Sequence, residues 1–275
     1  MYKRQVYDGL YSPDEFYFDP TQNFLAVPNE GTVINTIYQD SNSGAATLPG
    51  KIKFKDLDGD GQITENDRTV IGNTTPKFQG GFGLSGQWKN FDFTANFNYM
   101  VDFDVYNATN YMLSSSISNT NNFYNVLADF TQKNRWTYVR ADGECLYKNT
   151  NIDGSVNEYI TMNAGKSLWN PADVEDKVTH SYFVEDGSFL RLQDVTIGYT
   201  LPSNLTKKWG MSKVRFYASA SNLFILTGYS GYDPEVDVQS GLTPSMDYNR
   251  YPRSRSFVFG LSLIHISEPT RLGMI

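Results

Sequence analysis

The sequence has little of what enzyme sites and nucleic-acid-binding surfaces are usually made from. Its 275 residues include one cysteine, Cys145, and two histidines, His180 and His265. A single cysteine excludes an internal disulfide framework and a multi-cysteine metal site, and two histidines leave little for zinc or histidine-based catalysis. The net charge is -7, and lysine and arginine form no cluster that could follow a phosphate backbone. The composition therefore indicates neither an enzyme nor a nucleic-acid-binding protein.

Long hydrophobic runs are also missing. No stretch of about 18 consecutive apolar residues occurs, which excludes a transmembrane helix. A transmembrane β-strand needs only about 9–11 residues that alternate apolar and polar, so the missing hydrophobic runs do not exclude a membrane β-barrel. Aromatic residues are abundant, at 15% of the chain with 19 tyrosines and 18 phenylalanines. These features are consistent with a soluble β protein or with an outer-membrane barrel.

The most conspicuous motif is residues 56–67, which read D-L-D-G-D-G-Q-I-T-E-N-D. Acidic residues at positions 1, 3, 5 and 12 and a glycine at position 6 have the spacing of a calcium-binding loop. The expected Ca²⁺ ligands are Asp56, Asp58, Asp60, Gln62 (through its backbone carbonyl) and Asp67. Ile63 is expected to anchor the loop to a core. The alternative is an Asp- and Gly-rich turn without metal, and either form would stiffen a connection rather than catalyse a reaction.

The clearest strand pattern covers residues 78–88 and 91–101. Apolar and polar residues alternate strictly along both segments, which Lys89 and Asn90 join. Period-two alternation of this length predicts an antiparallel hairpin with one apolar and one polar face. The segment Gly81–Gly86 matches G-x-G-x-x-G, but it lies inside this strand, whereas a dinucleotide site needs the motif between a strand and a helix. We expect these glycines to allow strand bending or close approach of another segment.

Further strands are expected after a long polar region. Alternation returns at residues 189–200, with a change of parity that predicts a β-bulge near Gln193 and Asp194, and continues at residues 214–226 and 257–263. Shorter candidates near the N-terminus bring the total to about seven to nine strands. Residues 103–185 are expected to form long loops, interrupted by one hairpin of residues 133–140 and 159–163.

Aromatic residues in the expected loops are candidate ligand contacts, because aromatic rings stack on sugar rings. These candidates are Trp136, Tyr138, Trp169, Tyr229 and Tyr232. An aromatic girdle at the membrane interface is the alternative account of many aromatic residues in such a chain.

Four stretches together resemble the SusC/RagA group of TonB-dependent outer-membrane transporters. They are KFKDLDGDGQITENDRTVIGNTTPKFQGGFGLSGQWKNFDFTANF (residues 53–97), DGSFLRLQDVTIGYTLP (186–202), VRFYASASNLFILTGYSGYDPE (214–235) and YPRSRSFVFGLSL (251–263). The resemblance implies an all-β fold, the C-terminal part of a large antiparallel transmembrane β-barrel with long extracellular loops. Members of the group have roughly 22 strands around a plug domain. The chain shows no plug or TonB box, so we expect a barrel fragment.

The same resemblance implies a function and partners. The group imports glycan oligosaccharides or peptides across the bacterial outer membrane, together with a SusD-like surface lipoprotein and the TonB complex. The alternative is a secreted, calcium-stabilised β-sandwich that binds carbohydrate. A barrel would direct one set of side chains to lipid and a sandwich would bury the same set, namely Phe82, Leu84, Phe93, Phe97, Phe257 and Phe259.

Both ends of the chain resemble translated adapter sequence rather than barrel sequence. The strings are YKRQ at residues 2–5 and SLIHISEPTRLGMI at residues 262–275. The natural segment is therefore expected to cover residues 6–262, with residues 1–5 and 263–275 non-native.

Overall fold

The structure, a computed structural model, describes residues 3–19, 25–37, 47–115, 125–137, 156–171, 179–236, 244–249 and 251–265. The chain divides into two compact units. We call them the loop unit (Met1–Thr74, Val105–Glu185 and Asp237–Asn249) and the sheet unit (Thr75–Asp104, Asp186–Val236 and Arg250–Ile275).

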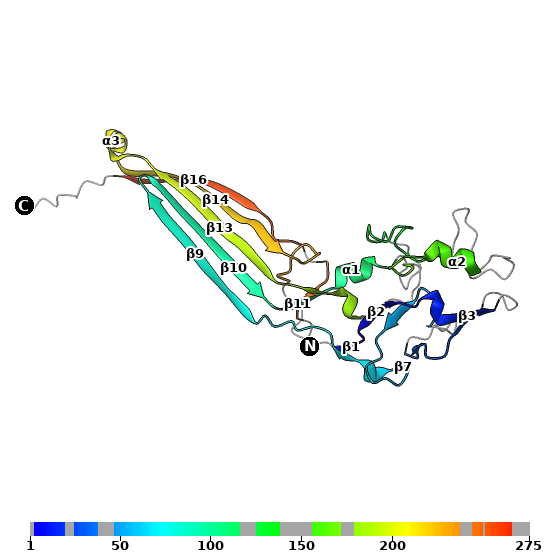
Figure 1. Cartoon of the computed structure of the whole chain (residues 1–275). Helices are drawn as coiled ribbons and strands as arrows, with labels where there is room; N and C mark the ends of the chain where they lie inside the picture. Colours follow the sequence, from blue (N-terminus) through cyan, green and yellow to red (C-terminus); the bar gives the residue numbers. More distant parts are fainter. Residues whose placement is uncertain are drawn as a thin grey trace, which may run out of the picture. The chain divides into compact units, whose positions relative to one another are not determined.

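The sheet unit contains one antiparallel sheet of five long strands (Figure 1). In the order in which they lie side by side, they are β16 (Ser256–His265), β14 (Met211–Thr227), β13 (Phe189–Thr200), β10 (Phe91–Val101) and β9 (Phe78–Trp88). The predicted hairpin is confirmed, since β9 pairs with β10 from Phe91 opposite Trp88 to Val101 opposite Phe78. The strict alternation of the sequence thus forms long strands with two chemically different faces.

Register keeps these two faces distinct across the sheet. Phe93 lies opposite Gly86 and Ile197, whereas Thr94 lies opposite Ser85 and Thr196. The predicted bulge is confirmed, because Asn96 and Phe97 on β10 pair with Asp194 and Leu192 on β13, which leaves Gln193 as the extra residue. Without this extra residue, alternation would carry the residues after it to the wrong face.

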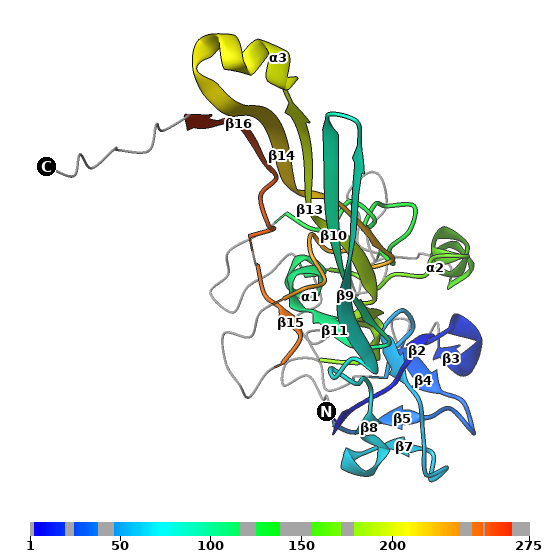
Figure 2. The ribbon, with the colours of Figure 1, turned by 90° about the vertical axis from the view of Figure 1, so that its left-hand side faces the viewer.

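The two ends of the sheet have different connections. Lys89, with a φ of 52°, turns β9 into β10, and the short helices α3 (Ser203–Thr206) and η6 (Lys207–Trp209) join β13 to β14. Figure 2 shows α3 and the β9–β10 turn at the same end. At the other end, residues 102–188 join β10 to β13 and residues 228–255 join β14 to β16.

The remaining elements are short. The other strands are β1 (Lys3–Arg4), β2 (Tyr7–Leu10), β3 (Phe16–Asp19), β4 (Leu25–Pro28), β5 (Ile34–Asn35), β6 (Ile52–Phe54), β7 (Gln62–Ile63), β8 (Thr69–Val70), β11 (Asp104–Asn107), β12 (Val184–Asp186) and β15 (Met246–Asp247). The other helices are η1 (Pro13–Glu15), η3 (Glu65–Asp67), α1 (Ala108–Leu113), α2 (Val156–Asn163) and η5 (Ser181–Phe183). Among the described residues, no helix has the length and apolar character needed to cross a membrane.

One sequence-based prediction about this region is wrong. Residues 159–163 do not form a hairpin strand, because they belong to helix α2, and Arg135 forms an isolated bridge with Leu168 instead. The sequence already contains the reason, since Val156, Tyr159 and Ile160 have the i, i+3, i+4 spacing of a helix rather than alternation. The expected partner residues 138–140 lie outside the described residues.

The loop unit has its own hydrophobic core. Its centre is Trp169, which is 1% exposed and packs with Phe54, Ile63 and Phe183. The prediction that Ile63 anchors the aspartate loop to a core is therefore confirmed. At the N-terminus, Gln5 is buried and its Nε2 donates to the carbonyl of Thr64 at 3.2 Å.

Candidate functional site

The apolar face of the five-stranded sheet is exposed. Phe82 and Leu84 on β9 are 47% and 54% exposed, and Phe259 on β16 is 81% exposed. The same face carries the other residues expected to meet lipid, namely Phe93, Phe97 and Phe257. A soluble sandwich would bury this face against a second sheet. Exposed apolar side chains of this kind are typical of the lipid-facing surface of a membrane β-barrel.

Aromatic side chains gather at the end of the sheet that has the short connections. Trp88 is 69% exposed and Trp209 is 59% exposed. The ring centroids of Phe91 and Tyr199 lie 4.7 Å apart, and the Nζ of Lys89 lies 4.9 Å from the centre of the Trp88 ring. Tryptophan and tyrosine with lysine nearby are typical of the boundary between lipid tails and water.

The opposite face of the sheet is joined by polar contacts between strands. The guanidinium of Arg215 on β14 binds the carboxylate of Asp92 on β10, with the Nε–Oδ1 distance at 2.9 Å. This pair crosses β13 above Gly198, where any side chain would collide with it. Asn96 donates to Asp194 at 3.1 Å and its Oδ1 lies over Gly83. Gly83 on β9 and Gly198 on β13 therefore make room for cross-strand contacts, as predicted for the glycines of β9, whereas Gly86 has open space around it.

A buried ion-pair network holds the segment after β14 to the sheet. Arg191 on β13 is 4% exposed, and its Nη2 donates to Asp233 at 2.6 Å. Glu235 lies 3.4 Å from the Nε of Arg191 and accepts from Arg253 at 2.7 Å. The buried Arg191 and Asp233 thus balance in charge, as buried ions require, and the partly exposed Glu235 and Arg253 extend the network toward the surface. Sequence reasoning missed this network, because its members lie far apart along the chain.

The aspartate loop brings three of its predicted ligands together. Ligand oxygens of Asp56, Asp58 and Asp60 lie within 4.8 Å of one another. Both oxygens of Asp56 accept backbone N–H groups, from Gly59 at 2.6 Å and Gly61 at 2.8 Å. The backbone of the loop thus fixes the carboxylates around one point. This donor set, three hard carboxylates at alternate positions, fits Ca²⁺.

The charges of this cluster repel one another. The Asp60 N–H lowers the pKa of the Asp58 carboxyl by hydrogen bonding, but loss of water and repulsion from the neighbouring carboxylates outweigh it and raise that pKa overall. A bound cation would relieve this repulsion.

The other two predicted ligands, Asp67 and Gln62, have surroundings that differ from those of the three clustered aspartates. Asp67 is fully buried, outside the three-carboxylate group, and its oxygens accept the N–H of Leu57 at 2.8 Å and of Thr64 at 2.7 Å. Burial would raise the pKa of Asp67, but these backbone hydrogen bonds outweigh it and lower that pKa. Gln62 is in β7, with its side chain exposed. Asp67 therefore closes the loop by binding its backbone.

The predicted ligand-contacting aromatics occupy different environments. Trp136, Trp169 and Tyr229 are 4%, 1% and 6% exposed, whereas Tyr232 is 77% exposed. Tyr138 lies outside the described residues. The Trp136 ring packs on Gly50, where a side chain would collide with it. Of the described four, Tyr232 is thus the one whose ring is free to stack on a ligand.

Sequence reasoning also missed His180, which lies inside the aromatic core. It is fully buried, stacks on Tyr7 at 5.5 Å between ring centroids, and accepts the N–H of Tyr182 through Nδ1 at 3.4 Å. Burial lowers its pKa from 6.5 to about 3, so it is neutral at ordinary pH. No local signal in the sequence marks it as a core residue.

Comparison with known proteins identifies relatives. No protein-family model matches the chain. TonB-dependent receptor P3 of Formosa agariphila is 34% identical over 240 residues, which cover 82% of the chain and 21% of that receptor. TonB-dependent receptor SusC of Bacteroides thetaiotaomicron is 29% identical over 212 residues, 76% of the chain and 17% of SusC. The chain thus spans about a fifth of the length of the curated relatives it matches.

Solved structures agree on the fold. The RagAB peptide importer in its closed-closed state superposes with a TM-score of 0.57 at 20% identity, over 95% of the chain and 22% of the importer chain. Another structure of the RagAB peptide transporter gives 0.56 at 21% identity over the same shares. These relatives are receptors and transporters rather than enzymes, as the sequence indicated. The chain belongs to the SusC/RagA group of TonB-dependent receptors, and its five long strands are part of the β-barrel of that group.

Proposed function

We propose that the chain forms part of the wall and the loops of an importer in the bacterial outer membrane. The observation that carries this proposal is the sheet itself, whose apolar face is exposed from Leu84 to Phe259 while its other face is polar. An apolar face of this size is stable against lipid and unstable against water. Because the relatives are TonB-dependent receptors, we infer that the TonB complex drives the transport.

The connections orient the sheet in this proposal. Outer-membrane barrels have short periplasmic turns and longer extracellular loops. The β9–β10 turn and helix α3 are therefore on the periplasmic side, and the long segments 102–188 and 228–255 are on the extracellular side. In this orientation the loop unit contributes to ligand capture outside the cell, where a SusD-like lipoprotein would cover it.

The cargo is a glycan oligosaccharide or a peptide. The solved RagAB structures are of a peptide importer, and an exposed tyrosine at position 232 suits stacking on sugars. Deleting the gene and measuring growth on single oligosaccharides and on peptides as sole nutrients tests both. Growth that is lost on one class and restored by the wild-type gene identifies the cargo. Unchanged growth on both, or recovery of the receptor from the soluble periplasm without detergent, contradicts the importer.

We also propose that the aspartate loop binds Ca²⁺ as a structural ion. The support is the convergence of Asp56, Asp58 and Asp60 within 4.8 Å. Isothermal titration of the receptor with calcium should show one site that Asp58→Ala removes. Glu65→Ala, which changes a neighbouring acid outside the cluster, should leave the site intact. If the wild-type receptor shows no heat of calcium binding, the proposal of a bound metal is wrong.

A further inference from the structure

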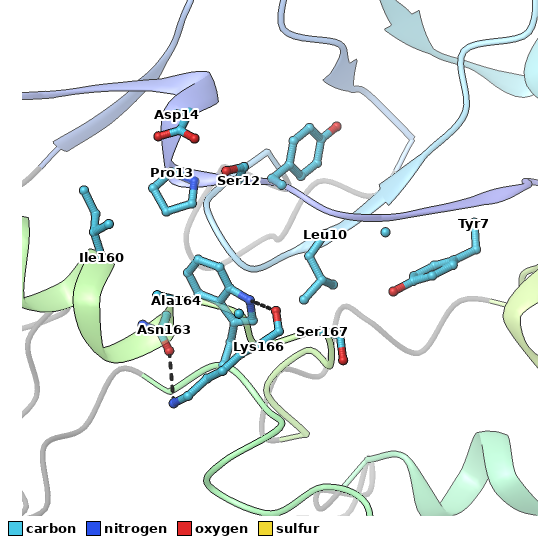
Figure 3. A pocket seen from close by; sticks show the side chains of 14 residues that line it. Tyr7, Leu10, Ser12, Pro13, Asp14, Ile160, Asn163, Ala164, Lys166 and Ser167 are labelled. Atoms are coloured by element: carbon cyan, nitrogen blue, oxygen red, sulfur yellow. Dashed lines mark hydrogen bonds between the residues drawn. The ribbon is translucent and has the colours of Figure 1, made fainter.

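A cavity of about 450 Å³ lies within the loop unit. One wall comes from the N-terminal segment, with Tyr11, Ser12 and Asp14, and the other from the end of α2 and the residues after it, including Asn163 and Lys166. Figure 3 shows Asp14 and Lys166 on opposite walls. The volume suits a ligand of the size of a sugar unit or a short peptide end.

Both walls are held in place by hydrogen bonds. On one wall, the Tyr11 N–H donates to the carbonyl of Lys51 at 3.0 Å, and the Tyr11 hydroxyl donates to the carbonyl of Val33 at 2.8 Å. On the other, the buried Asn163 side chain accepts from the Thr137 N–H and donates to its carbonyl, both at 3.0 Å. A ligand would therefore meet a cavity whose shape is largely formed before binding, which lowers the entropy cost of binding.

Trp136 connects these walls. Its N–H donates to the carbonyl of Leu168 at 2.8 Å, and its indole Nε1 donates to the carbonyl of Lys166 at 3.3 Å. It packs against Gly50 on the side of the N-terminal segment. Trp136, which lines the cavity, is thus held through both its backbone and its ring, and the ring is bound to the backbone of Lys166.

The electrostatics of the cavity are unbalanced on one wall. Lys166 lines the cavity, and Arg135 lies outside its lining but acts on Lys166 through its charge. Within the described ranges, neither forms an ion pair with a carboxylate. Their polar contacts are amide oxygens, Asn163 for Lys166 and Asn170 for Arg135, each at 3.4 Å. Burial and repulsion from Arg135 lower the pKa of Lys166, as expected of a cation without a counter-ion. On the opposite wall, Asp14 is exposed and its carboxylate is available to donors.

We propose that this cavity binds a small ligand with a carboxylate at one end, held by Lys166, and hydroxyl or ammonium donors at the other, held by Asp14. The substrate class of the importer then includes such ligands, so this inference rests on the proposed function. Two sources share this chemistry, an oligosaccharide that ends in a uronic acid and a peptide with a free C-terminus. The cavity would retain either one before it enters the barrel.

Saturation-transfer NMR on the receptor in detergent micelles tests the proposal. The probes are a digalacturonic acid and trialanine, each compared with a methyl ester or amide in which the carboxylate is blocked. We expect binding of at least one acid, weakened at least about tenfold in its carboxylate-blocked form and in Lys166→Met, because a charge-assisted hydrogen bond is lost. Lys166→Arg should retain most of the affinity. Binding of only one acid assigns the source.

Matched variants show whether the effect belongs to Lys166 itself. Lys133→Met removes an exposed lysine from the same region and should change nothing. Asp14→Asn should weaken binding less than Lys166→Met, because it keeps an acceptor. The binding proposal is overturned if the receptor inserts in the outer membrane but binds neither acid. It is also overturned if Lys166→Met binds as tightly as the wild type. Failure of the wild-type receptor to reach that membrane would instead contradict the proposed function.

Discussion

Trp88 in the sheet unit is 69% exposed, whereas Trp169 in the loop unit is 1% exposed. The same contrast holds for phenylalanine, with Phe259 at 81% and Phe183 at 2%. In the loop unit, short strands and turns surround an aromatic core that excludes water by itself. In the sheet unit, long strands leave their aromatic face to be covered by the surroundings. The chain thus covers aromatic surface in two ways, and in the proposed function the membrane covers that of the sheet unit only.

The largest expected effect separates the two tryptophans. Trp169→Ala removes a ring packed in the loop-unit core and should lower the free energy of opening of that unit by about 3–5 kcal/mol. Trp88→Ala removes an exposed ring and should change the same quantity by about 0.5 kcal/mol or less. Native-state hydrogen exchange on amides of the loop unit measures both. Equal effects of the two substitutions would erase the contrast.

The next effect concerns the faces of one strand. Phe93→Arg places a charge on the apolar face of β10 and should destabilise the barrel in lipid vesicles by about 2–4 kcal/mol. Thr94→Arg places the same charge on the polar face and should be tolerated far better. Denaturant titration of the receptor in vesicles compares them. A larger cost for Thr94→Arg would mean that the two faces have been assigned the wrong way round.

A smaller effect depends on pH and belongs to the loop unit alone. His180 has a folded-state pKa of about 3 and an ordinary pKa of 6.5, so between these values the unfolded chain binds a proton that the folded one does not. The free energy of opening should therefore fall as pH falls, by about 2 kcal/mol between pH 7 and pH 5.

Substitution tests this pH dependence. His180→Phe should flatten the slope contributed by this residue, because phenylalanine does not titrate. A slope that persists in His180→Phe would assign it to carboxylates instead.

Sequence reasoning succeeded where the signal is local. Alternation located the long strands, the parity change located the bulge at Gln193, and the spacing of Asp56, Asp58 and Asp60 predicted that their carboxylates converge. These features depend on the period of a strand or on a loop of a few residues, so neighbouring residues contain the information.

It failed where contacts join distant residues. Arg191 and Asp233 are 42 residues apart, and His180 meets Tyr7 and Phe54 from another part of the chain. The two walls of the cavity come from residues 7–14 and 160–167, with Trp136 between them. Tertiary packing alone brings such groups together.

The central claim is that the apolar face of the sheet meets lipid. This chain contains one cysteine, so the background for a direct test has Cys145→Ser and serine at any cysteine elsewhere in the receptor. Spin labels are then attached at cysteines that replace Ile197, on the apolar face, and Thr196, on the polar face of the same strand. In outer-membrane vesicles, the label at position 197 should be relaxed by dissolved oxygen and the label at position 196 by a water-soluble nickel complex. Relaxation of the position 197 label by the nickel complex would contradict the account.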